Sequence, residues 1–189
     1  MIARISKMIA NYLFKSEIIS EHESEIYIYG FETILSGIID LFITLFLGLL
    51  SKSLINSIVF FLMFVSMRIY TGGYHANTYL KCKTLFIIIN FIIIGCSKIQ
   101  MPLHMILMIL MMFLISVIFL APVENKKMEI TISEKKKYRK ISIVCSIFLS
   151  MTAIVTYFFS KNLSSTISIT AFIITILIVV GEFRKEVNS

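Results

Sequence analysis

The sequence predicts an all-α integral membrane protein, with six transmembrane helices and an N-terminal amphipathic helix in the membrane interface. Two features of composition indicate this class. Of the 189 residues, 58% are hydrophobic and only 15% are charged, whereas soluble domains hold about 45–50% apolar and about 25% charged residues. A third observation indicates the same class: long apolar runs alternate with short basic segments along the chain. The composition excludes an ordinary soluble globule, a disordered chain and a collagen-like chain.

Residues 1–25 are predicted to form an interfacial helix followed by an acidic connector. Apolar residues share one helical face and polar residues share the opposite face: Ile5, Met8, Ile9, Tyr12 and Leu13 against Arg4, Lys7, Asn11 and Lys15. Such a helix lies in the interface and suits a bilayer with anionic headgroups. A secretory signal peptide is the alternative, but Asn11 and Lys15 interrupt the apolar run that it needs.

The apolar runs predict six spans within a single transmembrane domain over residues 1–189, at 31–51, 53–69, 83–98, 103–121, 141–159 and 164–181. A helical span needs about 20 mostly apolar residues. The second and third spans are short, because only 15 residues separate Lys52 from Arg68 and only 14 separate Lys83 from Lys98. Short spans draw the segment that connects them toward the membrane surface.

Lysine and arginine distribute unequally between the two sides of this arrangement. Fifteen of the 18 basic residues fall on one side, and only Lys52, Lys98 and Lys161 fall on the other. The positive-inside rule makes the basic side cytoplasmic and, with six spans, puts both termini there. The net charge of +7 therefore indicates membrane orientation and not a nucleic-acid partner.

The largest share of this charge lies in a predicted cytoplasmic loop, residues 122–140. Its basic residues are Lys126, Lys127, Lys135, Lys136, Lys137, Arg139 and Lys140. The loop can anchor the protein on anionic headgroups or attract an acidic partner, and the two interpretations do not exclude each other.

The cytoplasmic segment 68–83 holds a histidine and a cysteine seven residues apart, His75 and Cys82. A nearby imidazole can take the proton of a cysteine nucleophile. In one straight helix the two residues lie about 10.5 Å apart along the axis, beyond hydrogen-bond reach. A Cys–His dyad therefore requires His75 in a loop that folds back over Cys82, and the helix-breaking Gly72-Gly73 pair allows such a fold.

Positive charge around this pair favours a thiolate, since Arg68, Lys81 and Lys83 flank it in sequence. The residues permit a dyad but do not demand one, and both can be ordinary loop residues. The spacing fits no structural zinc pattern, and we expect neither a metal nor a cofactor. With three cysteines a disulfide framework is not expected, and Cys96 and Cys145 lie inside spans as small apolar side chains.

The order Arg-x4-Gly-x-His-x6-Cys, formed by Arg68, Gly73, His75 and Cys82, resembles the accessory gene regulator B family. Its members are integral-membrane cysteine peptidases of Gram-positive quorum-sensing systems. The sequence Ala-Pro-Val-Glu-Asn-Lys-Lys at 121–127, with the basic run to Lys140, resembles the segment that follows the family's fourth span. Chain length, several spans and positive charge also fit, so the resemblance covers nearly the whole chain.

The resemblance implies a membrane-embedded cysteine endopeptidase that cuts the acidic C-terminal tail from a short amphipathic propeptide. The cysteine holds the peptide as a thioester acyl-enzyme, and an internal Cys or Ser of the propeptide closes a thiolactone or lactone autoinducing peptide. Carried over to this sequence, Cys82 is the nucleophile and His75 is the general base and later acid. Arg68 would position the substrate or stabilise charge, and Gly73 would supply the turn.

The resemblance also implies a homodimer in the plasma membrane of a Gram-positive bacterium, with the active site on the cytoplasmic face. The basic loop would hold the propeptide's acidic tail. For a group that orients His75, Glu32 is the first candidate and Asp40 the second. An acidic residue inside a span is costly and so indicates function, although Asp40 can equally pair with a neighbouring helix.

Two other function classes remain open at this point. A small transporter or peptide exporter could use Asp40 and the break at Gly72-Gly73 as parts of a translocation path. A non-enzymatic membrane scaffold needs no pairing of His75 with Cys82 and tolerates changes at both positions.

Overall fold

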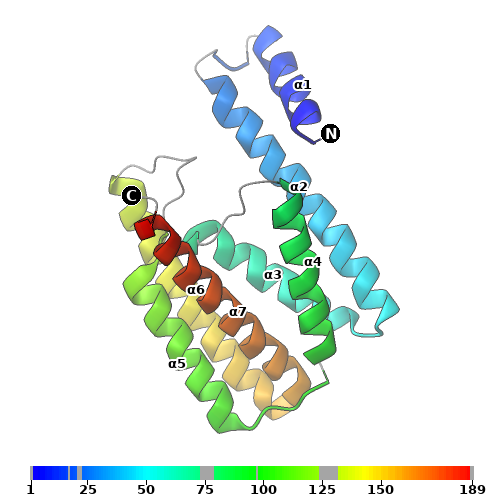
Figure 1. The fold of residues 1–189 in the computed structure, drawn as a ribbon, viewed down its shortest axis with the longest axis vertical. Coiled ribbons are helices and arrows are strands. Elements are labelled where there is room, and N and C mark those ends of the chain that lie inside the picture. Colours follow the sequence, from blue (N-terminus) through cyan, green and yellow to red (C-terminus); the bar gives the residue numbers. More distant parts are fainter. Residues whose placement is uncertain are drawn as a thin grey trace. The chain divides into compact units, whose positions relative to one another are not determined.

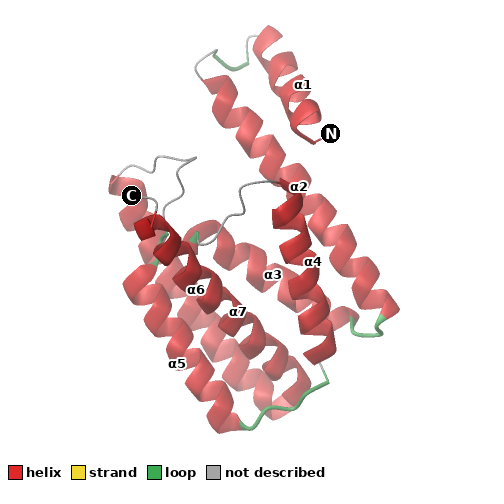
Figure 2. Cartoon of the chain, viewed as in Figure 1, coloured by secondary structure: helices red, strands yellow, loops and turns green. Residues whose placement is uncertain are grey.

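The computed structural model describes residues 2–16, 18–20, 23–72, 79–96, 98–123 and 132–187. These residues form helices and no named strand, which confirms the all-α class (Figures 1 and 2). The helices are α1 (Ile2–Lys15), α2 (Ser24–Leu50), α3 (Leu54–Thr71), α4 (Tyr79–Cys96), α5 (Leu103–Leu120), α6 (Ile132–Phe159) and α7 (Lys161–Val187).

Five helices of the described chain are long and apolar enough to cross a membrane: Ser24–Leu50, Leu54–Thr71, Leu103–Leu120, Ser133–Phe159 and Lys161–Phe183. They fit a multi-pass membrane protein. The predicted count of six is not confirmed, because the span expected at 83–98 corresponds to a shorter apolar helix, Cys82–Cys96. The whole of α4, 18 residues from Tyr79 to Cys96, rises about 27 Å at 1.5 Å per residue, against about 30 Å of hydrocarbon in a typical bilayer.

The chain divides into two compact units, Met1–Ile43 and Thr44–Ser189, and the single transmembrane domain stays a prediction. In the first unit, α1 occupies the segment predicted as an amphipathic helix. Ser6 and Ala10 are buried, whereas Met8 and Tyr12 are 65% and 70% exposed. Much of the apolar face is therefore uncovered, as a helix lying in a lipid interface requires. That location stays a prediction.

A short capping motif precedes α2 in the same unit. The backbone N–H and the hydroxyl of Ser20 donate hydrogen bonds to Oε2 of Glu23, at 3.0 and 2.7 Å. In a capping box, a serine is followed three residues later by a glutamate whose carboxylate accepts the serine's backbone N–H. The structure describes this half of the motif, and α2 begins at Ser24, before the apolar run that was expected to begin at 31.

In the second unit, α7 packs on α3, α5 and α6, α6 also packs on α3 and α5, and α4 packs on α3 and α7. The core takes one apolar face from each helix, and its fully buried members include Phe60, Met67, Ile93, Phe113 and Ile178. Small hydroxyl residues bring α6 and α7 close together, and Ser164 Oγ donates a 2.7 Å hydrogen bond to the Ala153 carbonyl. Asn90 of α4 donates a 3.0 Å hydrogen bond to Thr44.

The chain direction alternates in this unit, so that several helix termini meet at one end of it. The end of α3, the start of α4, the end of α5, the start of α6 and the end of α7 all lie there, in the upper part of the unit in Figure 1. The predicted catalytic and basic segments are parts of this end. Residues 132–140, expected as part of a loop, are the first turns of α6, because Glu, Lys and Arg are good helix formers.

Candidate active site

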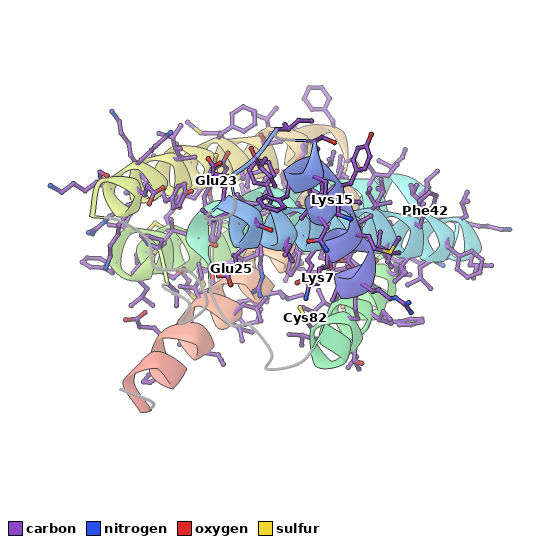
Figure 3. The ribbon with its side chains drawn as sticks, turned by 90° about the horizontal axis from the view of Figure 1, so that it is seen from above. Lys7, Lys15, Glu23, Glu25, Phe42 and Cys82 are labelled. Atoms are coloured by element: carbon purple, nitrogen blue, oxygen red, sulfur yellow. The ribbon has the colours of Figure 1, made fainter. Side chains whose placement is uncertain are left out.

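Cys82 lies in the first turn of α4, at the end of the unit where these termini meet (Figure 3). Its thiol is free and half-buried. Lys83, the next residue, is 9% exposed. A half-buried thiol is partly accessible and partly shielded, which suits a nucleophile that must meet a peptide bond while part of its surroundings excludes water.

Aromatic rings hold the start of α4 against the end of α3. The Phe86 ring, one turn after Cys82, lies 5.9 Å from the Phe60 ring and 5.8 Å from the Phe64 ring. Phe60 and Phe64 are also in contact, at 5.4 Å. Ring pairs at these separations are favourable beyond their buried area. They fix α4 at Phe86, one turn after Cys82, against the middle of α3, one turn before Arg68.

Arg68 occupies that last turn of α3. Its guanidinium carbon lies 5.9 Å from the centre of the Phe64 ring, and its Nη1 atom is buried. The Arg68 guanidinium and the Cys82 thiol lie within the range of electrostatic interaction. The structure therefore brings together two of the residues that the sequence motif named. A guanidinium at this position can stabilise negative charge on the sulfur or on an oxygen bound beside it.

A short backbone junction follows Arg68, formed by Thr71, Gly72 and Val123. The Val123 N–H donates a 2.9 Å hydrogen bond to the Thr71 carbonyl, and Gly72 and Val123 form a parallel β-bridge. Thr71 and Val123 are buried. The peptide bond between Ala121 and Pro122, shortly before Val123, is cis. The junction joins the two sequence segments that carry the family resemblance. This junction was not predicted from the sequence, although the diglycine and the apolar Ala-Pro-Val segment after α5 indicate a turn and a buried segment.

The basic start of α6 is fixed to the same end of the unit. The Tyr138 ring lies 6.2 Å from the Tyr70 ring of α3. Arg139 donates a 2.8 Å hydrogen bond from Nη2 to the Ile118 carbonyl in the last turn of α5. Basic side chains commonly satisfy helix-terminal carbonyls in this way. The remaining basic residues of this turn are exposed, namely Lys135, Lys136, Lys137 and Lys140.

The structure does not test the other predicted site residues. His75, Gly73, Lys126 and Lys127 lie outside the described residues. Glu32 and Asp40 are half-buried on α2, in the first unit. The Cys–His dyad and the orienting carboxylate therefore stay predictions. In the part of the chain that the structure describes, no group of three or more His, Cys, Asp or Glu side chains comes together.

Comparison with known proteins agrees with the motif. The sequence model of the family described as Accessory gene regulator B matches residues 6–180. The chain is 26% identical over 170 residues to AgrB-like protein 2 of Clostridium perfringens (strain 13 / Type A), an alignment that covers 84% of this chain and 79% of that protein. No solved structure matches the chain.

Proposed function

Because the chain belongs to the accessory gene regulator B family, we propose that it is a membrane-embedded cysteine endopeptidase that processes a quorum-sensing propeptide. The family is linked to the processing of autoinducing peptides. The observation that supports this function best is the position of Cys82, a half-buried free thiol that interacts with the buried guanidinium of Arg68. Neither a transporter nor a scaffold requires a cysteine in this setting.

The proposed reaction begins when the His75 imidazole takes the thiol proton of Cys82. The sulfur attacks the carbonyl carbon of the scissile peptide bond, and a C–S bond forms as the C–N bond breaks. The leaving amine of the acidic tail takes the proton back from His75, which acts now as an acid. An internal Cys or Ser of the propeptide then attacks the thioester, closes the thiolactone or lactone ring and releases the Cys82 sulfur.

Arg68 has a charge-stabilising role in this proposal. Its guanidinium can offset the negative charge of the attacking sulfur and of the oxyanion that forms at the carbonyl, and such preorganised donors are worth most where water is excluded. His75 is tethered to the end of α3 through Gly72, three residues away, which is about 11 Å of fully extended chain. This short tether supports an imidazole that acts beside Arg68 and Cys82.

The exposed lysines at the start of α6 provide a site for the propeptide's acidic tail. Lys135, Lys136, Lys137 and Lys140 are exposed, and we include Lys126 and Lys127 from the preceding segment. Arg139 differs, because its guanidinium bonds the Ile118 carbonyl. We place this surface and the active site on the cytoplasmic face of a Gram-positive plasma membrane, and we expect the protein to be a homodimer. Our candidate for the group that orients His75 stays Glu32, with Asp40 second.

A co-expression experiment tests the function. The adjoining reading frame is searched for a short propeptide with an internal Cys or Ser and an acidic tail, which is produced with the wild-type chain, with Cys82→Ala and with the matched controls Cys96→Ala and Cys145→Ala. We expect the Cys82→Ala variant alone to lose tail removal and ring closure. If Cys82→Ala still processes the propeptide, the chain is not a cysteine endopeptidase, and a scaffold or exporter role gains support.

A further inference from the structure

The junction of Thr71, Gly72 and Val123 constrains the backbone at the end of α3, one turn after Arg68. Gly72 ends α3 with φ +65° and ψ −129°, a conformation that glycine alone adopts readily. Its N–H donates a 3.2 Å hydrogen bond to the carbonyl of Arg68, and the neighbouring Thr71 carbonyl accepts the Val123 N–H. The same three residues therefore end the helix turn that carries Arg68 and join it to the chain after α5.

The junction also leaves no room for a side chain at position 72. A β-carbon there would collide with the Val123 carbonyl oxygen and would lie 3.3 Å from the Val123 carbonyl carbon. Gly30, Gly37 and Gly95 differ, because a β-carbon at any of these positions meets nothing within 4 Å. The close backbone approach, and not a general preference for glycine, is what distinguishes Gly72.

Burial makes the junction a fixed point. Thr71 is fully buried and its hydroxyl donates a 2.8 Å hydrogen bond to the Met67 carbonyl, while Ala121 and Val123 are each 4% exposed. Buried backbone hydrogen bonds of this kind resist displacement, because a donor or acceptor left without a partner is costly. The last turn of α3 is thus held from both its own helix and the end of α5.

We propose that this junction is a positioning device that keeps the Arg68 guanidinium beside Cys82, with Gly72 and Val123 as positioning residues. The inference rests on the proposed function, since it gives Gly72 a role in the reactivity of the same thiol. The junction sets where the last turn of α3 ends, and Arg68 in that turn lies on the Phe64 ring. The Phe64 and Phe60 rings in turn hold Phe86, one turn after Cys82, against α3. If the junction is lost, Arg68 moves, while the aromatic contacts still hold the start of α4, which carries Cys82.

The test measures the alkylation rate of Cys82 by iodoacetamide at pH 7, resolved by site with mass spectrometry in proteoliposomes. A free cysteine is only a few per cent thiolate at this pH, so a nearby cation accelerates alkylation. We expect Gly72→Ala to slow the Cys82 reaction roughly five-fold, and Gly95→Ala to leave it unchanged. The rates of Cys96 and Cys145 serve as internal references and should not change in either variant.

A double-mutant comparison separates positioning from a structural defect. In an Arg68→Met background, Gly72→Ala should have no further effect, because the cation that it displaces is already gone. A variant that merely loosens the fold would change the Cys82 rate in both backgrounds and would raise the rates of Cys96 and Cys145. Equal slowing in both backgrounds, or a wild-type rate in Gly72→Ala, overturns the inference.

A second pair of variants covers the case in which Gly72→Ala fails to fold. Val123→Pro removes the N–H that donates to Thr71, whereas Val123→Ala keeps it. We expect only the proline variant to slow alkylation of Cys82, and equal rates in the two variants would contradict the proposal. Failure here is distinct from failure of the proposed function: if Cys82→Ala abolishes processing but the junction variants alkylate normally, only the positioning role is lost.

Discussion

Helices α2 and α7 are both 27 residues long and strongly apolar, yet they are buried to very different extents. Over its most apolar window, α7 has 56% of its residues buried, whereas α2 has 11%. The first half of α7 contributes a run of buried small hydroxyl residues: Ser164, Ser165, Thr166, Ser168 and Thr170. In α2, large side chains such as Phe42 and Phe46 are exposed.

Hydrophobicity therefore does not determine which helix is buried by its neighbours in this chain. Lipid is as apolar as leucine, so helices associate where small side chains allow close approach and where hydroxyls can bond to neighbouring carbonyls. The candidate site follows the same division, because Arg68 and Cys82 lie in the packed unit and Glu32 and Asp40 lie in the first unit. The predictions below test this difference, in order of decreasing effect.

The largest effect should come from a cavity in the packed unit. Phe113 of α5 is fully buried, so Phe113→Ala should reduce the free energy of unfolding by about 3–5 kcal/mol. Phe42 of α2, which is labelled in Figure 3, is 67% exposed, and Phe42→Ala should change stability by less than about 0.5 kcal/mol. Thermal unfolding in detergent micelles measures both. Equal losses of stability would break the comparison.

The next effect concerns catalysis. Arg68→Met should slow propeptide processing by roughly 100-fold, the usual consequence of removing one charge-stabilising donor. Arg68→Lys should recover part of the rate, because the charge remains but the planar guanidinium does not. Glu32→Gln on α2 should cost less, since a residue that orients the base acts indirectly.

Initial processing rates in proteoliposomes provide the measurement for Arg68 and Glu32. If Glu32→Gln reduces the processing rate more than Arg68→Met does, the chemistry depends more on the first unit than on the packed unit, which would contradict the comparison.

A third prediction enlarges a small residue in the packed helix. Ser168 of α7 is fully buried and donates a 2.9 Å hydrogen bond to the Ser164 carbonyl. Ser168→Leu should separate α7 from its neighbours and cost about 1–3 kcal/mol. Ser168→Ala is the matched control and should cost less than about 1 kcal/mol, because the small size is kept. If leucine at this position is tolerated as well as alanine, small size does not define the packed helix. The shift in Tm distinguishes the outcomes.

The smallest effect separates two kinds of basic residue on α6. Lys136→Gln combined with Lys140→Gln should weaken propeptide binding a few-fold, remove part of its salt dependence and leave Tm unchanged. Arg139→Gln removes the bond to the Ile118 carbonyl and should lower stability by about 1 kcal/mol. Binding at two ionic strengths, with Tm measured for each variant, checks both. Salt-independent binding by the wild-type chain would eliminate a tail-binding role for these lysines.

Much of the fold could be predicted from the sequence, because membrane spans depend on local composition. The run at 103–121 predicted α5, Leu103–Leu120, and the run at 53–69 predicted α3, Leu54–Thr71. The start of α6 was expected as a loop because its lysines are polar, but polarity does not prevent helix formation outside the bilayer.

Less of the candidate site could be predicted. The motif identified Arg68 and Cys82, and the structure puts them within the range of electrostatic interaction, while their catalytic roles stay predictions. The hydrogen bond from Val123 to Thr71 joins residues 52 positions apart, and that from Arg139 to Ile118 joins different helices. Neither has a periodicity that marks its partner, so both required the three-dimensional structure. The dyad of His75 with Cys82 and the role of Glu32 stay predictions.

The central claim is that Cys82 forms a covalent bond with the propeptide, and mass spectrometry of the protein and its proteolytic peptides tests it most directly. Wild-type protein in proteoliposomes is mixed with a propeptide whose internal Cys or Ser is replaced by Ala, so that ring closure cannot remove the adduct, and is quenched in acid. One half of the sample is then treated with hydroxylamine, which cleaves thioesters. The account predicts an adduct on the Cys82 peptide with the mass of the propeptide minus its tail, lost on hydroxylamine treatment. An adduct absent under conditions in which the tail is released, or one located on Cys96 or Cys145, would contradict it.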